Sequence, residues 1–257
     1  MGNQTLHSSK ILVPGDVQVA AEDLRASFPE PRFFPPPFAT TVDGLVCVGG
    51  SLQAEWLLDA YQHGIFPWPV WQDEPMAWWS PDPRAVLELG QFHVSRRLRR
   101  TILSHKFVVT CDTDFRSVIE GCATAVGRRG ATWLLPSMID AYCEMHRLGH
   151  AHSVETWLEN QLVGGTYGIS IGGLFAAESK FYRVRDASKV ALVHLVNHLR
   201  SRGYQLLDVQ QWTPHTGRMG VTKIPRRQYL RRLATTVQLP VTFGTTLEAD
   251  ATAVRNG

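Results

Sequence analysis

The sequence predicts an α+β fold, with a small N-terminal α/β domain and a larger C-terminal domain that has a largely antiparallel sheet. Between residues 152 and 178, strand-like segments follow one another with only turn signals between them: ENQ and the glycine pairs 164–165 and 172–173. Such short turns join antiparallel strands, whereas parallel strands need a long crossover. Helical patterns lie before and after this run, which argues against a doubly wound sheet.

The chain has 257 residues, of which 44% are hydrophobic and 19% charged, so it can bury one large core or two small ones. We expect a lead-in over residues 1–30, the N-terminal domain over 31–93, the C-terminal domain over 94–235 and a tail over 236–257. The formal net charge of +3 permits a nucleic-acid partner but does not require one.

The N-terminal domain begins with a short buried strand over residues 44–50, which ends in a glycine turn. Ser51 can cap a helix that ends at Gly64, and Trp56, Leu57 and Tyr61 follow helical spacing. Residues 65–87 are dense in tryptophan and proline. We expect them to form a stiff, non-helical loop that lines a site.

The C-terminal domain begins with a basic helix over residues 94–104 and a strand over 106–112. Two helices follow, over 115–125 and 134–150, the second with Pro136 in its first turn and Gly149 as its stop. After the antiparallel strands, the pattern predicts a helix over 188–203 and a strand over 204–210.

The four cysteines lie singly and far apart, at Cys47, Cys111, Cys122 and Cys143. Isolated cysteines of this kind are typical of buried, reduced thiols. No apolar run reaches the length of a membrane-spanning helix, and the first residues lack the pattern of a signal peptide. We therefore expect a cytoplasmic protein without a membrane partner.

Polar residues in two predicted strands form the first candidate site. Glu178 lies in AAESKF, and Asp208 and Gln210 lie in LLDVQ. Residues two apart in a strand face the same side, so Asp208 and Gln210 should project together. A carboxylate can accept a proton or hold an ammonium group, and a carboxamide can orient a substrate. Taken alone, the pair also fits the solvated end of a strand.

Histidines and glycines offer two weaker candidates. His146, His150, His152 and Glu155 are close in sequence, but Gly149 should break the helix and the glutamate is not placed as in HExxH. Histidines that cap a helix end are the better interpretation, and we expect no metal. The paired glycines lie between strands rather than before a helix, which indicates hairpin turns rather than a phosphate loop.

The basic helix is the fourth candidate. It carries Arg96, Arg97, Arg99 and Arg100, and Arg84 precedes it in the aromatic segment. Arg96 and Arg100 share a helix face. Basic side chains next to aromatic platforms suit the single-stranded end of an RNA, where unstacked bases lie on rings. The alternative is a basic face that only contacts solvent.

Several segments together resemble the leucyl/phenylalanyl-tRNA–protein transferase family of bacteria, in family order from about residue 44 to 233. The matching segments include GLVCVGGSL (44–52), LLDAYQHGIFPW (57–68), WWSPDPRAVL (78–87), VSRRLRRT (94–101), AAESKF (176–181), LLDVQ (206–210) and IPRRQYL (224–230). The resemblance implies a GNAT-like acyltransferase fold for the C-terminal domain. It also implies transfer of Leu, Phe or Met from aminoacyl-tRNA, without cofactor or metal, to the α-amine of proteins that begin with Arg or Lys. Such proteins are thereby marked for degradation by the N-degron pathway.

The resemblance also implies roles for particular residues. Asp208, Gln210 and Glu178 would handle the reacting amine, with Asp208 as a base or as a positioning group and Glu178 as a partner for the acceptor's Arg or Lys. The positions near the terminal adenosine of the tRNA are Trp68 and Trp133, with Tyr61 and Tyr142 as weaker candidates. The positions around the aminoacyl side chain are Phe175, Leu192 and Leu207. Phosphate contacts are expected from Arg84 and the four arginines of the basic helix.

The chain departs from the family pattern at two positions. Lys180 stands in ESKF where the family commonly has ESMF, and Thr166 stands where a bulky apolar residue is often found. A lysine can lay its stem along an apolar pocket with its charge outside, or it can reshape the pocket. We expect an altered preference among Leu, Phe and Met.

Two other functions remain open from the sequence. A GNAT-type acetyltransferase would need a pyrophosphate-binding turn of the form R/Q-x-x-G-x-G/A, and the sequence has no good copy of it. A non-catalytic RNA-binding module could be built from the basic helix and the tryptophans. It predicts that Asp208→Ala leaves all activity intact.

Overall fold

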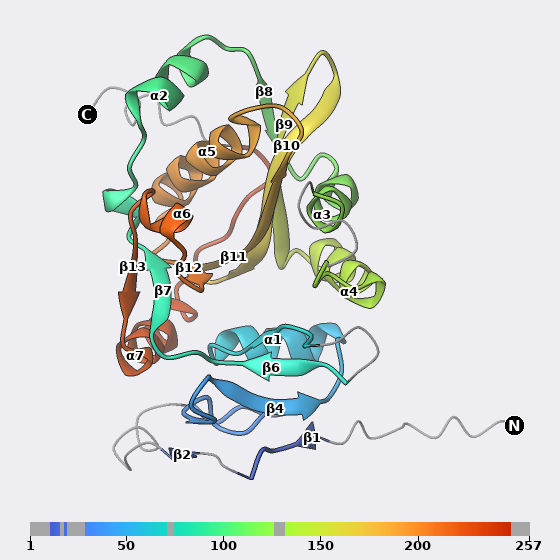
Figure 1. The fold of residues 1–257 in the computed structure, drawn as a ribbon, viewed down its shortest axis with the longest axis vertical. Helices are drawn as coiled ribbons and strands as arrows, with labels where there is room; N and C mark the ends of the chain where they lie inside the picture. The colour runs from blue at the N-terminus through green and yellow to red at the C-terminus, as the bar shows by residue number, and fades with distance from the viewer. Residues whose placement is uncertain (1–10, 16–17, 20–28, 71–74, 126–131, 248–257) are drawn as a thin grey trace, which may run out of the picture.

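The protein is built around two main β-sheets, which lie one above the other in the computed structural model (Figure 1). The structure describes residues 11–15, 18–19, 29–70, 75–125 and 132–247. The smaller sheet has the strand order β1-β4-β6-β5, and the larger has the order β13-β7-β12-β11-β10-β9-β8. This arrangement confirms the predicted α+β class, with a small N-terminal sheet and a larger, mostly antiparallel one. The predicted lead-in and tail lie partly outside the described residues.

The smaller sheet confirms the strand predicted over residues 44–50, which forms as β4 (Leu45–Gly49). The predicted helix after it is α1 (Ala54–Gln62), which lies between this sheet and the rest of the molecule (Figure 1). The other strands are β1 (Ile11–Leu12), β5 (Phe66–Pro67) and β6 (Ala77–Trp79), and a separate pair is formed by β2 (Gln18–Val19) and β3 (Ala39–Thr40). The aromatic segment is therefore not only a loop, because it contains β5 and β6.

The chain passes from one sheet to the other at residues 80–83, before the boundary that we expected near residue 93. The next strand, β7 (Arg84–Leu87), lies inside the larger sheet between β12 and β13. All four of its residues are buried. A strand buried on both faces shows no alternation of polar and apolar residues, so the sequence pattern did not separate it from the preceding loop.

The larger sheet begins with four antiparallel strands in chain order. They are β8 (Val108–Cys111), β9 (Ala151–Leu158), β10 (Gln161–Ile171) and β11 (Leu174–Tyr182). β12 (Leu206–Gln210) then pairs with β11 in parallel, and helix α5 (Ala187–Ser201) forms the crossover between them. β13 (Val221–Ile224) and β12 both pair with β7 in antiparallel orientation.

Helices cover both faces of the larger sheet (Figure 1). α3 (Phe115–Ala123) and α4 (Pro136–Arg147) lie on one side, and α5 lies on the other. The predicted basic helix is α2 (Arg96–Leu103), which packs near α5. The structure also contains the short helices η2 (Leu89–Gln91) and α6 (Pro214–Gly217) and helix α7 (Arg226–Thr236), which we did not expect from the sequence.

The core of the larger domain is formed where α5 packs on the sheet. Leu195, Val196 and Leu199 of α5 are at most 1% exposed. Each such side chain contributes about 1.5–3 kcal/mol when it is removed from water. Phe243, in the predicted tail, is also buried, and its carbonyl oxygen lies 2.7 Å from Nε2 of His198. The chain beyond residue 235 therefore packs on the core up to this point. No helix in the described part of the chain has the length and apolar character needed to cross a membrane.

Candidate active site

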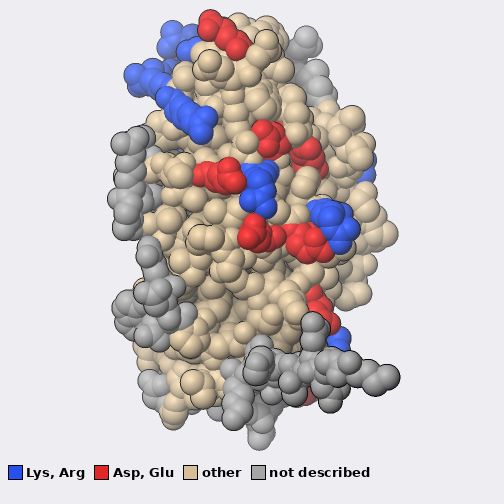
Figure 2. Space-filling model, turned by 90° about the vertical axis from the view of Figure 1, so that its right-hand side faces the viewer, with Lys and Arg blue, Asp and Glu red and all other residues tan. Residues whose placement is uncertain are grey.

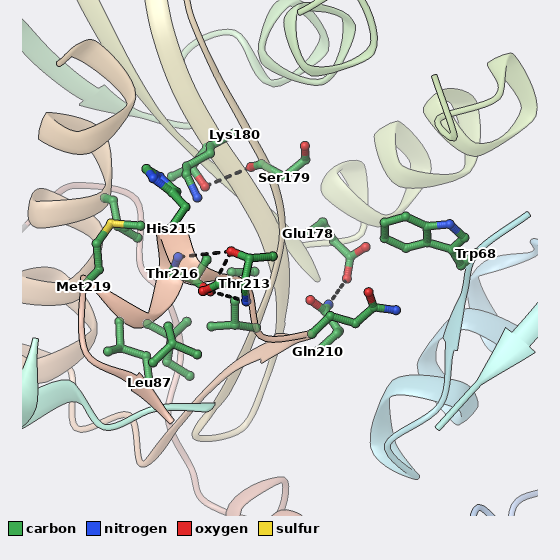
Figure 3. Close-up of a pocket in the computed structure, with 17 residues that line it drawn as sticks. Trp68, Leu87, Glu178, Ser179, Lys180, Gln210, Thr213, His215, Thr216 and Met219 are labelled. Carbon is green, nitrogen blue, oxygen red and sulfur yellow. Dashed lines mark hydrogen bonds between the residues drawn. The ribbon is translucent and has the colours of Figure 1, made fainter. Parts of the chain in front are cut away.

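The central cavity opens where β11 and β12 separate. These parallel strands pair only over Leu174–Ala176 and Leu206–Asp208. Beyond those pairs, residues of both strands line a cavity of about 280 Å³ (Figure 3). It is also lined by residues of β7, β10, β13, α5 and α6, and by Trp68, which comes from the small N-terminal part. The site is therefore assembled from segments far apart in sequence.

Two β-bulges aim the polar side chains of this site. In the β10–β11 ladder, Tyr167 pairs with Ser179 and Gly168 pairs with Ala177, so Glu178 is the extra residue. In the β12–β7 ladder, the register shifts between Asp208 and Gln210, and Gln210 has a φ of 57°. A bulge breaks the two-residue alternation of a strand and re-aims its side chains.

The bulge in β12 corrects the expectation that Asp208 and Gln210 project together. Gln210 lines the cavity, whereas Asp208 is 1% exposed and does not. The backbone N–H of Gln210 donates to Oδ1 of Asp208 at 2.9 Å, while its side-chain Nε2 donates to Oε1 of Glu178 at 2.8 Å. Asp208 thus fixes the backbone from which Gln210 reaches Glu178.

Glu178 lies at the centre of a chain of hydrogen bonds. The hydroxyl of Tyr142 donates to Oε2 of Glu178 at 3.3 Å, and the hydroxyls of Tyr61 and Tyr142 lie 2.7 Å apart. Burial raises the pKa of Glu178 to about 7; the charge of Asp208 adds to this rise, while hydrogen bonds from the two tyrosines and the charge of Arg84 oppose it. Near neutral pH this carboxyl group can therefore both accept and release a proton.

Tyr61 and Tyr142 are the two buried tyrosines of this hydrogen-bond chain. They are 2% and 0% exposed. Burial and the nearby charge of Glu178 raise the pKa of both phenols well above the usual range, so both stay protonated. The resemblance suggested a contact with the terminal adenosine for these residues, but in the structure they support the carboxyl group.

Asp208 is held by a buried arginine. Nε and Nη2 of Arg84 donate to the two carboxylate oxygens of Asp208 at 2.9 and 2.6 Å, and the hydroxyl of Tyr229 donates to Oδ2 at 2.8 Å. Nη1 of Arg84 donates to the carbonyl of Gly64 at 2.9 Å, and the guanidinium lies over the rings of Phe66 and Tyr229. Burial lowers the pKa of Arg84, but the charge and hydrogen bonds of Asp208, together with Tyr229 and Glu178, raise it above the usual value.

Arg84 is therefore not a tRNA contact, contrary to our expectation. Its side chain is 1% exposed, and three of its nitrogens donate to Asp208 and Gly64. A phosphate cannot reach a guanidinium in this position without unfolding of the surrounding structure. Tyr229, which lies in the IPRRQYL segment, was not among the expected site residues.

Trp68 forms the aromatic end of the cavity and stacks on Trp133. The rings of Trp68 and Trp133 are stacked, with centroids 4.6 Å apart and an interplanar angle of 13°. Trp68 lines the cavity and is 36% exposed, so one of its faces or edges is open to a ligand. The structure thus stacks the two tryptophans that the resemblance assigned to the terminal adenosine. Of these, Trp68 lines the same cavity as Glu178 and Gln210 (Figure 3).

The walls of the cavity are mostly apolar. Leu192 and Leu207 line it, while Phe175 is 1% exposed and packs in the same core cluster without lining the cavity. Thr166 and Lys180, which we expected to alter the pocket, also line it and face each other in the β10–β11 register. Further lining residues, which the sequence did not predict, come from β7, β13 and the segment around α6: Leu87, Thr213, His215, Thr216, Met219 and Val221.

The four arginines of α2 lie outside the cavity, near the end of the molecule away from the small sheet (Figure 1). Arg96, Arg97 and Arg100 are exposed, whereas Arg99 is half-buried. Nε of Arg97 lies 3.9 Å from Oδ2 of Asp186. Positive charge in the first turn of a helix opposes the helix dipole, so Arg96 and Arg97 reduce the stability of α2, whereas Arg100 lies in the last turn, where positive charge is favourable.

The face that carries α3 and α4 has a different charge pattern. Figure 2 shows basic and acidic side chains interspersed over it. Arg116 forms ion pairs with Glu120 and Asp140, and Arg147 pairs with Glu144. Interspersed charges of both signs create only a weak field for a polyanion, in contrast to the run of arginines on α2.

Members of the histidine cluster form hydrogen bonds with neighbouring residues. Nδ1 of His152 lies 2.7 Å from Oδ2 of Asp112, and Nδ1 of His146 lies 2.8 Å from the carbonyl oxygen of Ala151. Glu155 is fully buried and accepts hydrogen bonds from Thr110 and Ser153. Among the residues that the structure describes, no three His, Cys, Asp or Glu side chains are grouped as a metal site would need.

Comparisons with known proteins identify the family. The family model described as "Leucyl/phenylalanyl-tRNA protein transferase" matches residues 86–234, and the model of its N-terminal domain matches residues 50–82. A leucyl/phenylalanyl-tRNA–protein transferase of Syntrophobacter fumaroxidans is 50% identical over 206 residues, which cover 80% of this chain and 88% of that protein. The corresponding protein of Azoarcus sp. is 49% identical over 190 residues, with 74% and 80% covered.

Among solved structures, FemX shows a distant likeness, with a TM-score of 0.44, 10% identity, and coverage of 68% of this chain and 67% of that chain. The family matches place the chain among the aminoacyl-transferring enzymes. It belongs to the leucyl/phenylalanyl-tRNA–protein transferase family.

Proposed function

We propose that this protein transfers an aminoacyl group from aminoacyl-tRNA to the α-amine of an acceptor protein. The observation that carries the proposal is the Glu178–Gln210 pair inside an apolar-walled cavity, with the stacked Trp68 and Trp133 at one end. The tryptophans offer a platform for the terminal adenosine. The acid–amide pair offers a place for the amine beside the ester that it attacks.

The proposed donors are Leu-, Phe- and Met-tRNA, and the proposed acceptors are proteins that begin with Arg or Lys. Leu192 and Leu207 support an apolar donor, because each CH2 group buried against them contributes about 0.8 kcal/mol. The acceptor's cationic side chain would be attracted by the carboxylate of Glu178. We place the reaction in the cytoplasm, where aminoacyl-tRNA is made, and its products in the N-degron degradation pathway.

The chemistry needs positioning more than activation, because the aminoacyl ester is already reactive. The amine nitrogen forms a bond to the ester carbonyl carbon, the carbon–oxygen bond to the ribose breaks, and the ribose hydroxyl leaves with a proton. The amine must lose a proton in the same process. Glu178 suits this step because its pKa is about 7, and Gln210 can orient the amine through its carboxamide.

Asp208 acts in this proposal as a positioning residue. Both of its oxygens already accept hydrogen bonds from Arg84, and its side chain does not line the cavity. It fixes the backbone N–H of Gln210 and thereby the direction of the Gln210 side chain. Removing it should impair transfer through Gln210 rather than through loss of a base.

The tRNA body would contact the arginines of α2. Arg96, Arg97 and Arg100 are exposed, and Arg99 is half-buried on the same helix. Phosphate contacts of this kind release counterions, so binding should weaken steeply with salt.

The test is transfer of radiolabelled leucine from Leu-tRNA to a model protein with an N-terminal Arg, by wild type, Glu178→Gln and Asp208→Asn. We expect labelled acceptor with wild type and strong loss in both variants. If folded wild-type protein gives no label with Leu-, Phe- or Met-tRNA, while it still binds tRNA, the binding-module alternative would replace the proposal.

A further inference from the structure

A group of cations lies between helix α2 and the cavity. α2 packs near α5, and Figure 1 shows α5 and α6 on the side of the larger sheet away from α3 and α4. The loop from β11 into α5 carries Arg185 and Asp186, and Lys189 follows in the first turn of α5. Residues of α6 form part of the cavity wall. The start of α5 is therefore the segment that can connect the arginines of α2 with this wall.

Asp186 holds three cations together at this point. Its Oδ2 lies 3.9 Å from Nε of Arg97 on α2 and 4.0 Å from Nε of Arg185, and its Oδ1 lies 3.3 Å from Nζ of Lys189. The side chain of Asp186 is 10% exposed, whereas those of the three cations are between 42% and 73% exposed. One carboxylate offsets only one of three positive charges, so the group presents net positive charge to the solvent.

Positive charge continues from this group to the cavity wall. His215 of α6 lines the cavity, and its pKa is lowered, first by partial burial and then by the positive charges of Lys180, Lys189 and Arg218. Lys189 thus acts both on Asp186 and on the cavity wall. Arg218 is exposed at the C-terminal end of α6. The solvent-facing cations between α2 and the cavity form what we term the α5 track: Arg97, Arg185, Lys189 and Arg218.

The α5 track has the position that a path for a polyanion would need. Figure 3 shows His215 at one end of the cavity and Trp68 at the other, with Glu178 and Gln210 between them. A strand that comes from α2 along the track would enter at the His215 end and pass Glu178 before its last base reaches Trp68. The ester at the end of that strand would then lie beside the acid–amide pair.

We infer that the α5 track binds phosphates of the single-stranded 3′ end of the tRNA and leads this end from α2 into the cavity. The inference rests on the proposed function, since it gives a path to the tRNA that supplies the donor. Cations that contact only phosphates fix the position of a strand without reading its bases. The track therefore acts in the same way on every donor tRNA and leaves the choice of the amino acid to the apolar cavity walls.

The experiment compares one uncharged tRNA with and without its single-stranded CCA end, in binding titrations at several salt concentrations. The variant combines Lys189→Gln with Arg218→Gln. Each phosphate contact on a single strand contributes roughly 0.7 to the slope of log K against log salt, so the variant should lower the slope for the complete tRNA by roughly 1.4. The ratio of wild-type to variant affinity should then change about sevenfold between about 50 and 200 mM salt. For the truncated tRNA, both proteins should give the same slope.

Two further proteins serve as controls. Arg116→Gln removes an exposed cation on the face with interspersed charges and should leave the slopes for both tRNA forms unchanged. Arg96→Gln combined with Arg100→Gln should lower the slope equally for both forms, because α2 would contact the body of the tRNA. In leucine transfer, the variant with Lys189→Gln and Arg218→Gln should raise KM for Leu-tRNA and keep kcat near the wild-type value, since the track lies away from the reacting ester.

Three outcomes would overturn the inference while leaving the proposed function intact. In a folded variant with Lys189→Gln and Arg218→Gln, they are an equal loss of slope for both tRNA forms, no loss for either form, and a raised KM for the acceptor protein with unchanged tRNA binding. The last of these would assign the cations to the acceptor. If wild type itself binds the complete and the truncated tRNA equally, the CCA end does not enter the cavity, and that result would count against the proposed function.

Discussion

Arg84 and Asp208 are 124 residues apart in the chain, yet they form a bidentate ion pair in which both side chains are 1% exposed. One partner comes from β7 and the other from β12, which are neighbours in the larger sheet. Through Gly64 and Phe66, the same guanidinium contacts the small N-terminal part. The pair therefore joins the two parts of the molecule, and in β12 its carboxylate partner stands between the cavity-lining residues Leu207 and Val209.

Arg84→Met should destabilise the protein strongly. The substitution leaves the Asp208 carboxylate buried without its cation, and breaking a buried pair in this way costs about 3–5 kcal/mol. Arg84→Lys should recover only part of the loss, because an ammonium cannot donate to both carboxylate oxygens and to Gly64 in the same planar geometry. Urea unfolding measures the free energy of unfolding of both Arg84 variants. Arg116→Met removes exposed ion pairs and should change the free energy of unfolding little. Equal losses of stability in the Arg84→Met and Arg116→Met variants would contradict this view.

Glu178 should set the pH dependence of transfer. With a pKa of about 7, its basic form increases as the pH rises through neutrality, so kcat/KM should rise over that range. Glu178→Gln should lower kcat/KM by about 10²–10⁴-fold and flatten the profile. A profile of unchanged shape in the Glu178→Gln variant would assign the titration to another group.

Titration of Glu178 should lower the stability of the protein as the pH rises, whereas it raises the rate of transfer. Because the pKa of Glu178 is raised in the folded state, from 4.5 to about 7, the folded protein binds more protons than the unfolded chain between these values. The free energy of unfolding should therefore fall as the pH rises through this window. Wild type and Glu178→Gln, compared by urea unfolding at several pH values, should differ most in slope between pH 4.5 and 7. Parallel curves would show that the carboxyl group titrates normally.

Trp133 should contribute to tRNA binding through the stack with Trp68. Stacking of a base on an aromatic ring is worth about 1–3 kcal/mol, so Trp133→Ala should weaken binding of a CCA-ended oligonucleotide by roughly 5- to 150-fold. Trp133→Phe should retain part of the affinity because it keeps a ring. Fluorescence titration measures the change. Trp212→Ala removes an exposed tryptophan that does not line the cavity and serves as the control.

The arginines of α2 should account for part of the salt dependence of tRNA binding. Removing one arginine–phosphate interaction should reduce the slope of log K against log salt by roughly 0.7 to 0.9. Arg96→Gln combined with Arg100→Gln should therefore lower the slope by roughly twice that amount. Arg116→Gln, on the face with interspersed charges, should leave it unchanged. Equal slopes for all three proteins would place the tRNA elsewhere.

The sequence predicted the regular elements well where one face of an element is apolar and the other is not. Trp56, Leu57 and Tyr61 fixed α1, and turn signals fixed the hairpins of β9, β10 and β11. The motifs also placed Glu178 and Gln210 in one site, and the structure shows them hydrogen-bonded.

Other features depend on contacts that no local pattern contains. The bulges at Glu178 and near Gln210 shift the register by one residue, and the bulged residues themselves are neither glycine nor proline, although Gly168 lies opposite the first bulge. Arg84 looked like a surface charge, because only the three-dimensional pairing with Asp208 explains its burial. The lining from α6 and β13 was missed for the same reason, since it reaches the cavity only through the order of strands in the sheet.

The position of β7 inside the larger sheet also bears on how the protein can be divided. A fragment beginning at residue 94 would lack this interior strand, so β12 and β13 would each be missing a neighbour and would expose unpaired backbone groups. It would also lack Arg84 and leave Asp208 as a buried, unmatched charge. The residues up to Leu87 therefore supply an interior strand and a buried ion-pair partner to the larger sheet. A truncated or chimeric protein would have to keep or exchange all of these residues together.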